Sequence, residues 1–389
     1  MSKINFIYYI IHAKAKLISF LFSNRKIDSN KIVIDNFIGK GYGDNLKVIV
    51  ERLIEIKPEL KIKWIVRDKN EDMPMYIEKI KYGSFKSMYE YVTAKVWIDN
   101  VRNNIKPIKR HDQIYLQTWH GPFSSKKIEK MAENNLSKLY VKEAKRDGKI
   151  VDAILSNSRI QDEQYEKYFW LSENVEILKY GFPRNDFIIN NIENDLLINN
   201  IKEKLNVDRD SYLILYAPTF RDDYSVNCYS LDFRNILNVF ENKINKKCKI
   251  LIRLHPNVQK YSKDFKYDTD IINVTYYSNM QELALCCDSI ISDYSSTLFD
   301  FAIQYKPAFI CALDLEEYKI KRGLVNEYFN YPFPFSTSNE ELISKINSFD
   351  YQNYYQRLKS YFKINPLYDD GNSTKKIVDW IIKKINHFD

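Results

Sequence analysis

Hydrophobic residues in the first half of the chain gather in short runs, and stretches with helical spacing separate these runs. The runs that predict β-strands lie at 31–37, 61–66, 96–99, 115–121, 152–155 and 175–178. The stretches that predict helices lie at 44–57, 84–93 and 134–146. Strands that alternate with helices in this way predict a parallel, doubly wound sheet.

The second half of the chain repeats this plan after a polar, Asn-rich stretch at 187–208, which we interpret as an interdomain connection. Strand patterns recur at 212–223, 249–257, the start of 290–301, and 307–313, and a last helix is predicted at 374–386. Pro218 and Pro256 break two of these strands, because proline has no N–H group for a sheet ladder. The pattern therefore predicts two α/β domains.

Residues 290–301 are the stretch around which the second half is organised. An apolar run leads into Asp293 and Tyr294, two serines follow, and the apolar spacing then becomes helical. Ser295 is a natural N-cap, so the strand should turn into a helix there. The N–H groups of a helix start suit a phosphate, but a capped helix without a ligand would give the same pattern.

Polar side chains follow several predicted strands of the second half at their carboxyl ends. They are Thr219, Arg221, Arg253, His255, Ser295 and Ser296. Because the carboxyl ends of parallel strands share one edge of a sheet, these cations and hydroxyls should converge. Guanidinium groups combined with N–H donors are the chemistry that binds a diphosphate.

His120 follows a predicted strand of the first half. An imidazole with an unperturbed pKa of about 6.5 can act as a general base near neutral pH. The alternative for any histidine is a hydrogen-bonded structural role, which we expect for His12, His111 and His387. The strand-end positions favour a functional role for His120 and His255.

Residues 1–29 combine basic and apolar positions in one predicted helix. The positions that recur at helical spacing are Ile4, Tyr8, Ile11, Ala15, Ile18 and Phe22. His12, Lys14 and Lys16 interrupt the apolar runs, so no span of about 18 residues is available to cross a bilayer. A helix of this kind is predicted to lie on an anionic membrane surface; the alternative is a helix packed on the body of the protein.

The composition narrows the class of protein. The chain has 389 residues, 45% of them hydrophobic, and a net charge of +8, which suits a sizeable core and an anionic partner. Five cysteines with no CxxC pair predict reduced thiols and no zinc site. No metal-ligand spacing occurs, and no cofactor is predicted. The absence of a dense basic cluster with interleaved aromatic residues argues against nucleic-acid binding.

Six motifs, in this order, resemble the CDP-glycerol glycerophosphotransferase family of teichoic acid and capsule polymer polymerases and primases. They are QTWHG (117–121), YGFPRND (180–186), LYAPTFRD (215–222), RLHP (253–256), SDYSSTLFDFA (292–302) and DLEEY…RG (314–323). The resemblance runs from about Val33 to Trp380. It implies a GT-B fold, in which two Rossmann-like domains face each other across a cleft. It also implies peripheral attachment to the cytoplasmic face of the cell membrane.

The resemblance further implies roles for single residues. His120 matches the base for the acceptor hydroxyl, and His255 matches a second essential histidine at the donor diphosphate. The remaining residues that match donor-binding positions are Gly121, Arg184, Pro218, Thr219, Arg221, Arg253, Ser295, Ser296 and Asp300. This chain has Pro122-Phe123-Ser124 where most members read threonine-proline-leucine, a departure that bears on acceptor or donor preference.

Domain boundaries and an activity follow from these inferences. The predicted parts are a membrane-associating helix (1–29), an acceptor domain (30–186), a connection (187–208), a donor-binding domain (209–365) and a C-terminal helix (366–389). The predicted reaction transfers glycerol phosphate from CDP-glycerol to a hydroxyl of a lipid-linked or polymeric acceptor and releases CMP. The alternatives are a CDP-ribitol-dependent transferase, a GT-B nucleotide-sugar transferase and a non-catalytic scaffold.

Overall fold

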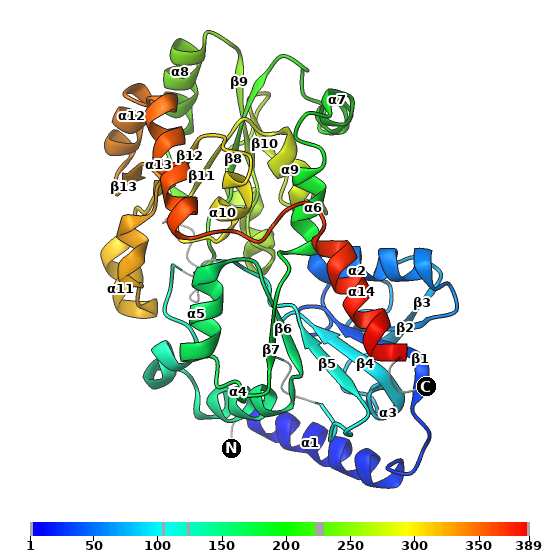
Figure 1. The fold of residues 1–389 in the computed structure, drawn as a ribbon. Helices are drawn as coiled ribbons and strands as arrows, with labels where there is room; N and C mark the ends of the chain where they lie inside the picture. Colours follow the sequence, from blue (N-terminus) through cyan, green and yellow to red (C-terminus); the bar gives the residue numbers. More distant parts are fainter. Residues whose placement is uncertain (1–2, 103–105, 123–124, 222–228, 387–389) are drawn as a thin grey trace. The chain divides into compact units, whose positions relative to one another are not determined.

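The computed structural model describes residues 3–102, 106–122, 125–221 and 229–386. The chain divides into two compact units. Unit 1 comprises Met1–His120, Glu129–Asp186 and Leu367–Asp389, and unit 2 comprises Gly121–Ile128 and Phe187–Pro366. Each unit has its own sheet and is described by itself (Figure 1).

The sheet of unit 1 has the order β3-β2-β1-β4-β5-β6-β7, and its paired strands all run parallel. The strands are β1 (Asp28–Asp35), β2 (Lys61–Val66), β3 (Ile77–Lys81), β4 (Ala94–Asp99), β5 (Ile114–Gln117), β6 (Ala153–Ser156) and β7 (Glu176–Lys179). Asp35, the last residue of β1, lies opposite Asp99, the last residue of β4. The two carboxylates are thereby brought to the same edge of the sheet.

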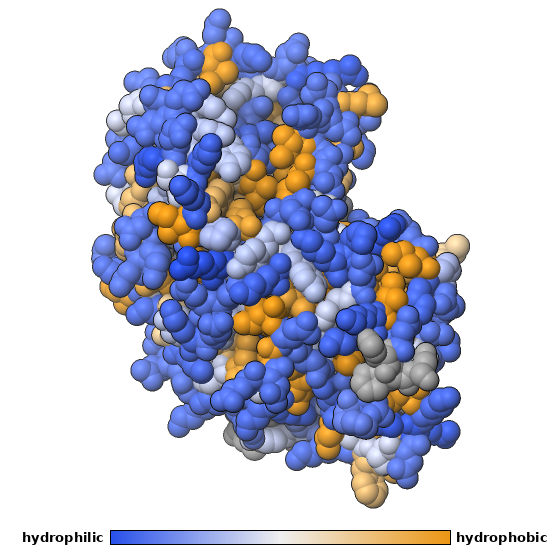
Figure 2. All heavy atoms as spheres, viewed as in Figure 1, coloured by the Kyte–Doolittle hydropathy of each residue, from blue (hydrophilic) through white to orange (hydrophobic). Residues whose placement is uncertain are grey.

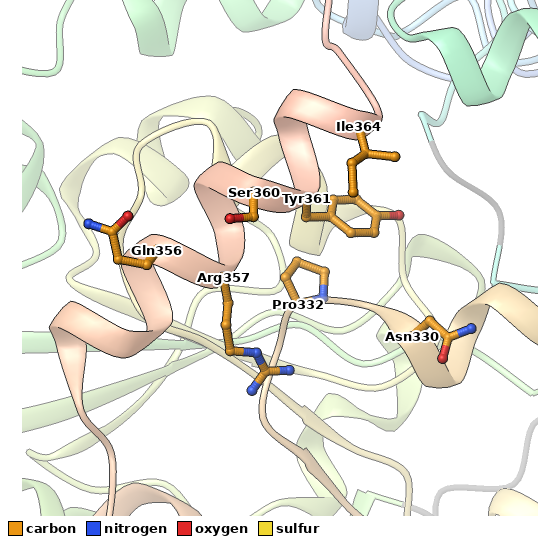
Figure 3. A pocket seen from close by; sticks show the side chains of 7 residues that line it. All are labelled: Asn330, Pro332, Gln356, Arg357, Ser360, Tyr361 and Ile364. Atoms are coloured by element: carbon orange, nitrogen blue, oxygen red, sulfur yellow. The ribbon is translucent and has the colours of Figure 1, made fainter.

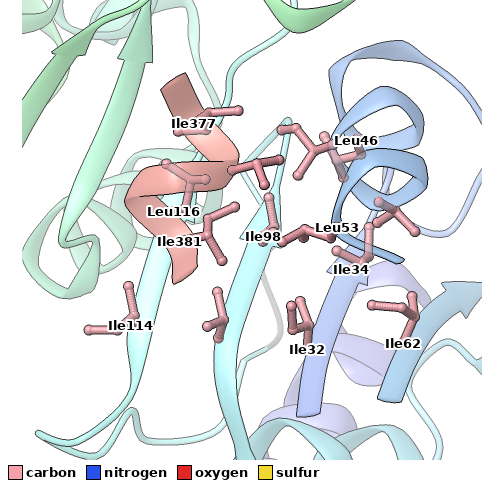
Figure 4. Close-up of a cluster of buried hydrophobic side chains, with 14 of the residues drawn as sticks. Ile32, Ile34, Leu46, Leu53, Ile62, Ile98, Ile114, Leu116, Ile377 and Ile381 are labelled. Atoms are coloured by element: carbon pink, nitrogen blue, oxygen red, sulfur yellow. The ribbon is translucent and has the colours of Figure 1, made fainter. Parts of the chain in front are cut away.

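Helices cover both faces of this sheet. They are α1 (Lys3–Leu21), α2 (Asp44–Ile56), α3 (Phe85–Thr93), α4 (Lys138–Ile150), α5 (Arg159–Tyr168), α6 (Pro183–Ile189) and α14 (Ser373–Asn386), with a 3-10 helix η1 (Glu129–Asn135). On one face, Leu46 and Leu53 of α2 and Ile377 and Ile381 of α14 pack on isoleucines of the central strands (Figure 4). The C-terminal helix is therefore part of the core of unit 1.

The sheet of unit 2 has the order β10-β9-β8-β11-β12-β13 and is also parallel. The strands are β8 (Tyr212–Tyr216), β9 (Cys248–Ile252), β10 (Ile271–Asn273), β11 (Ser289–Ser292), β12 (Ala308–Cys311) and β13 (Phe335–Ser336). The predicted α/β class, with two doubly wound parallel sheets, is confirmed.

The helices of unit 2 connect these strands. They are α7 (Asp195–Lys204), α8 (Phe233–Ile244), α9 (Met280–Cys286), α10 (Thr297–Ala302), α11 (Leu315–Arg322), α12 (Asn339–Asn347) and α13 (Tyr351–Ile364), with 3-10 helices η3 (Pro256–Asp264) and η4 (Asn326–Asn330). Ile236 and Phe240 of α8 and Leu342 and Ile346 of α12 pack on one face of the sheet. Cys248, Cys286, Cys287 and Cys311 are buried free thiols, and Cys228 lies outside the described residues.

The N-terminal helix α1 uses one face for packing and leaves another apolar. Ala15 and Ile18 are buried against Met88 and Val92 of α3. The exposed apolar residues of α1 are Tyr9, Ile10, Leu17, Phe20 and Leu21. In the part of the chain that is described, no helix is both long enough and apolar enough to cross a membrane. Hydrophilic residues cover most of the face shown in Figure 2, and its apolar residues form separate patches.

Candidate functional site

The candidate site residues of unit 2 lie where four neighbouring parallel strands end. Strands β9, β8, β11 and β12 are adjacent in that order, so the residues after them share one edge of the sheet. Arg253 and His255 follow β9, Pro218, Thr219 and Arg221 follow β8, and Asp293 to Ser296 follow β11. The order of the strands in the sheet therefore brings these positions to one edge, as predicted.

Arg221 occupies the centre of a buried ion-pair network at this edge. Its Nε and Nη2 donate to the two carboxylate oxygens of Asp314, at 2.6 and 2.8 Å, in a bidentate pair. Nη2 also donates to Asp293 Oδ2 at 2.9 Å. The Tyr294 and Tyr318 rings stack on each other with their centroids 3.6 Å apart. The Arg221 guanidinium lies 5.1 and 4.9 Å from the two ring centroids. Arg221 thus joins three strand ends, and its role in donor binding stays a prediction.

Asp293 fixes the backbone that follows β8 and β11. Its Oδ1 accepts hydrogen bonds from the Thr219 N–H at 2.8 Å and from the Tyr294 N–H at 2.6 Å. The Tyr229 hydroxyl donates to the Thr219 carbonyl at 3.0 Å. The Pro218-Thr219 turn is therefore held by side chains from two other segments, as a preorganised ligand-binding turn requires.

Arg253 differs from Arg221 because no carboxylate of the described residues pairs with it. Its Nη1 donates to the Tyr277 carbonyl, and no acidic group among the described residues lies within ion-pair distance. Burial alone lowers the pKa of Arg253 to about 10, which still leaves the guanidinium charged at neutral pH. A charged, mostly buried group without a counter-charge is electrostatically suited to an anionic ligand.

The contacts of His255 define its tautomer. The side chain caps η3, and Nδ1 accepts the Asn257 N–H at 3.1 Å. A neutral imidazole that accepts at Nδ1 must carry its proton on Nε2. The ring also packs against Phe220, with centroids 4.5 Å apart. The Nε2–H group of His255 can therefore donate a hydrogen bond to a phosphate oxygen.

The two serines lie one residue earlier relative to the helix than predicted. Helix α10 begins at Thr297, so the N-cap is Ser296, which makes no side-chain capping bond. Ser295 Oγ instead accepts from the Thr297 N–H at 3.3 Å and pairs with Thr297 Oγ1 at 2.9 Å. Both backbone positions lie at the strand-to-helix turn, as expected. Asp300 is buried within α10, and its donor contact stays a prediction.

Gly121 lies against this turn within unit 2. A Cβ atom added to Gly121 would stand 2.8 Å from Ser296 Oγ, which is closer than van der Waals contact allows. The segment that follows is anchored by a Lys127 N–H to Gly323 carbonyl bond of 3.2 Å and a Val325 N–H to Ser125 carbonyl bond of 3.0 Å. A side chain at this position would force the Ser296 hydroxyl group to move. Phe123 and Ser124, part of the predicted departure from the family pattern, lie outside the described residues.

The candidate site residues of unit 1 surround His120. Its Nδ1 lies 2.7 Å from the Asn100 carbonyl oxygen, and a carbonyl oxygen can only accept. Nδ1 therefore carries the proton in the neutral ring, and Nε2 has the lone pair. This is the tautomer that a general base needs.

Arg184 lies beside His120 in unit 1 and contacts it through the backbone. Its Nη1 donates to the His120 carbonyl at 2.9 Å and to Asp44 Oδ1 at 2.6 Å. The side chains of Arg184 and Asp44 are each only 8% exposed. The sequence did not indicate Asp44 or Asn100 as site residues, although Asp44 begins the predicted helix at 44–57 and Asn100 directly follows the predicted strand at 96–99.

Backbone strain gathers near His120. Phe37, Ile38, Asp44 and Trp119 all have φ values between 45° and 58°, in the left-handed region that non-glycine residues avoid. The Phe37 and Trp119 rings contact the His120 ring, at centroid distances of 5.7 and 4.5 Å. Strain of this kind persists where surrounding contacts fix it, and it is common at functional sites.

Two buried carboxyl groups lie at the ends of β1 and β4, directly before Asn36 and Asn100. Burial raises the pKa of Asp35 to about 7, and nearby Asp99 adds to the shift. Burial also raises the pKa of Asp99 to about 6, against the opposing effect of Lys106, whose Nζ lies 2.8 Å from Asp99 Oδ2. One of the two carboxyl groups is thus readily protonated near neutral pH.

Other features lie away from these groups. A hollow of about 410 Å³ lies between α13 and the end of η4, and none of the predicted site residues lines it (Figure 3). Within the described residues, no three His, Cys, Asp or Glu side chains gather as a metal ion would need.

Comparisons with known proteins agree with this arrangement. A family model described as CDP-glycerol:poly(glycerophosphate) glycerophosphotransferase matches residues 17–383. The teichoic acid poly(glycerol phosphate) polymerase of Staphylococcus epidermidis is 30% identical over 91% of this chain and 50% of that protein. The polymerase of the same description from Bacillus subtilis is 29% identical over 93% of this chain and 50% of that protein. The chain thus spans about half the length of these two relatives.

The solved structures show the same fold. A variant of the wall teichoic acid polymerase TagF superposes with a TM-score of 0.83 at 27% identity, covering 100% of this chain and 99% of that chain. Another TagF structure follows a soak with CDPG. The predicted GT-B class, with two Rossmann-like units, is confirmed by this match.

The raised pKa values predict how stability depends on pH. Asp35→Asn mimics the protonated carboxyl group, so it should raise the free energy of unfolding at pH 8, where wild-type Asp35 is charged, by on the order of 2 kcal/mol. At pH 5 folded Asp35 is protonated, but Asp35 of the unfolded chain is still mostly charged, so the difference should be smaller than at pH 8 and should vanish only below about pH 4. Thermal unfolding at both pH values measures this, with the exposed Asp72→Asn as control. A variant that is less stable than wild type at pH 8 would contradict the assignment.

Proposed function

The chain belongs to the CDP-glycerol:poly(glycerophosphate) glycerophosphotransferase family, and we propose that it transfers glycerol phosphate from CDP-glycerol to a hydroxyl of a teichoic acid or capsule polymer acceptor, releasing CMP. The proposed acceptor is lipid-linked or polymeric. The enzyme would use no cofactor of its own.

The opposite tautomers of the two histidines are the observation that carries this proposal. His120 has its lone pair on Nε2, because Nδ1 donates to a carbonyl group. His255 has its proton on Nε2, because Nδ1 accepts an N–H group. A transfer reaction needs one group that accepts a proton and another that binds phosphate, and the two imidazoles are set for these separate tasks.

Unit 2 would bind the donor. Arg253 supplies a positive charge without a carboxylate partner, and His255 supplies an N–H donor. The turn at Ser295 and Ser296, with Gly121 packed against it, would contact the donor through hydroxyl and backbone N–H groups. Pro218, Thr219 and Asp300 complete the proposed set of donor-binding residues, while Arg221 holds the turn in place.

The chemistry then needs one proton transfer and one displacement. His120 Nε2 takes the proton of an acceptor hydroxyl, whose oxygen attacks the phosphorus that carries glycerol. A new P–O bond forms, the bond to the bridging oxygen breaks, and CMP leaves with the electron pair. Negative charge spreads over the phosphoryl oxygens in the transition state, so nearby cations and N–H donors lower the barrier.

We further propose that the protein works at the cytoplasmic face of an anionic membrane, where a lipid-linked acceptor would be found. The exposed residues Leu17, Phe20 and Leu21 of α1 give an apolar surface, and Lys16 is exposed beside them. Apolar side chains next to lysines favour the interface of an anionic bilayer.

A donor screen tests the proposed function. The purified protein, supplied with a lipid-linked glycerol phosphate acceptor, is incubated with CDP-glycerol, CDP-ribitol or UDP-sugars, and released nucleotide is measured. CMP release from CDP-glycerol should exceed release from the other donors at least tenfold. Preference for CDP-ribitol would identify a ribitol phosphate transferase, and UDP release a sugar transferase. No turnover with any donor would contradict an enzymatic role.

Substitution of His120 should mainly affect kcat, whereas substitution of His255 should mainly affect CDP-glycerol binding. His120→Ala removes the base and should lower kcat by about 10²- to 10⁴-fold, with CDP-glycerol affinity little changed. His255→Ala removes a hydrogen-bond donor to the phosphate and should weaken CDP-glycerol binding about tenfold. Turnover and equilibrium dialysis measure the two quantities, and exposed His111→Ala is the matched control. Near-normal turnover of the first variant would remove His120 from the mechanism.

The membrane proposal predicts a surface effect. A Leu17→Glu, Phe20→Glu double variant should lose at least tenfold in binding to vesicles that contain phosphatidylglycerol, because the apolar contact is replaced by anions. Vesicle flotation measures binding. Ile320→Glu, which changes an exposed isoleucine of unit 2, is the control and should bind as wild type does. Wild-type protein that fails to float would overturn the proposal.

A further inference from the structure

The hydrogen bonds around His120 close into a ring that passes through four residues of unit 1. His120 Nδ1 donates to the Asn100 carbonyl at 2.7 Å, and Asn100 Nδ2 donates to Asp44 Oδ2 at 2.9 Å. Asp44 Oδ1 accepts from Arg184 Nη1 at 2.6 Å, and the same nitrogen donates to the His120 carbonyl at 2.9 Å. We call these four residues the His120 clamp.

We propose that Asp44, Asn100 and Arg184 are positioning residues that hold His120 in its base tautomer, and that Arg184 acts on His120 rather than on the donor. The proposal rests on the proposed function, in which His120 is the base. It gives Arg184 a different role from the donor contact that family resemblance implies.

The clamp fixes His120 at two points. The bond to Nδ1 sets the tautomer and the ring orientation, and the bond to the carbonyl group sets the backbone. When Nε2 takes a proton, the Asn100 carbonyl stays bonded to Nδ1–H and stabilises the imidazolium. Without the bond from Nδ1 to the carbonyl group, the ring would also populate the tautomer with Nε2 protonated, which cannot accept a proton at Nε2.

Asn100 can perform this task because its own position is fully determined. It is completely buried, its Oδ1 accepts the Phe37 N–H at 2.8 Å, and its Nδ2 also donates to Asn36 Oδ1 at 2.7 Å. The backbone carbonyl that meets His120 is therefore held through the side chain of the same residue. Loss of that side chain should release the carbonyl.

Asp44 limits what Arg184 can offer to a donor. The carboxylate lies 2.6 Å from Nη1 and cancels most of the charge of the guanidinium. Asp44 stands at the first position of α2. The Arg184–Asp44 pair therefore presents little net charge, in contrast to Arg253.

The test compares turnover with donor binding in Arg184→Gln, Asp44→Asn and Asn100→Ala. Each should lower kcat 10- to 100-fold, while the CDP-glycerol Kd, measured by equilibrium dialysis, stays within twofold of wild type. Arg184→Lys keeps the charge and one donor group and should recover part of the lost kcat. Lys31→Gln breaks a buried ion pair with Glu90 in the same unit and is the matched control for lost stability, with kcat unchanged.

Results that overturn the inference differ from those that overturn the function. If Arg184→Gln weakens CDP-glycerol binding tenfold, Arg184 is a donor ligand and the inference fails, although the enzyme activity stands. Unchanged kcat in all three variants also overturns it. If wild type turns over no donor, the proposed function fails. Histidine ¹⁵N NMR then still tests the His120 clamp. Wild-type His120 should show one tautomer, protonated at Nδ1, and the Asn100→Ala variant should show a mixture of tautomers. A mixture in the wild-type protein would refute the clamp.

Discussion

One buried guanidinium holds together the strand ends that carry the candidate site residues of unit 2. Arg221 follows β8, and it bonds to Asp293 after β11 and to Asp314 after β12. Removing three charges from water is costly unless their geometry and hydrogen bonds compensate. Here a bidentate pair, a second carboxylate and two tyrosine rings provide that compensation. The turns that carry Thr219 and Ser295 are therefore fixed without a ligand.

The same interaction explains why two arginines at one sheet edge differ in their capacity to attract an anion. Arg221 and Arg253 follow adjacent strands, β8 and β9. The two carboxylates around Arg221 exceed its charge, whereas Arg253 meets only a carbonyl group among its described partners. This difference supports the proposal that Arg253 and His255, rather than Arg221, attract a diphosphate. A count of basic residues would have treated the two arginines as equal.

The sequence predicted the strands and helices better than it predicted which residues form ion pairs. Alternating apolar runs placed the central strands, and Pro218 and Pro256 marked where two of them end, so the convergence of polar groups followed from sheet geometry. The partners of Arg221 and Arg184 were not predictable, because Asp314 is 93 residues from Arg221 and Asp44 is 140 residues from Arg184. The amphipathic helices α8 and α13 were also missed, although in α8 the apolar residues Phe233, Ile236, Phe240 and Ile244 recur at helical spacing and carry the signal.

The candidate residues of the two units are preorganised at different energetic cost. In unit 2 the turns are held by compensated ion pairs and hydrogen bonds. In unit 1 the surroundings of His120 include left-handed residues such as Phe37 and Trp119, and the buried acids Asp35 and Asp99. These features destabilise a fold at neutral pH, and folds retain them where a local geometry is needed. An imidazole base needs such a geometry more than a phosphate site does, because a proton is transferred along one direction from one nitrogen, whereas a dispersed anionic charge is bound from many directions.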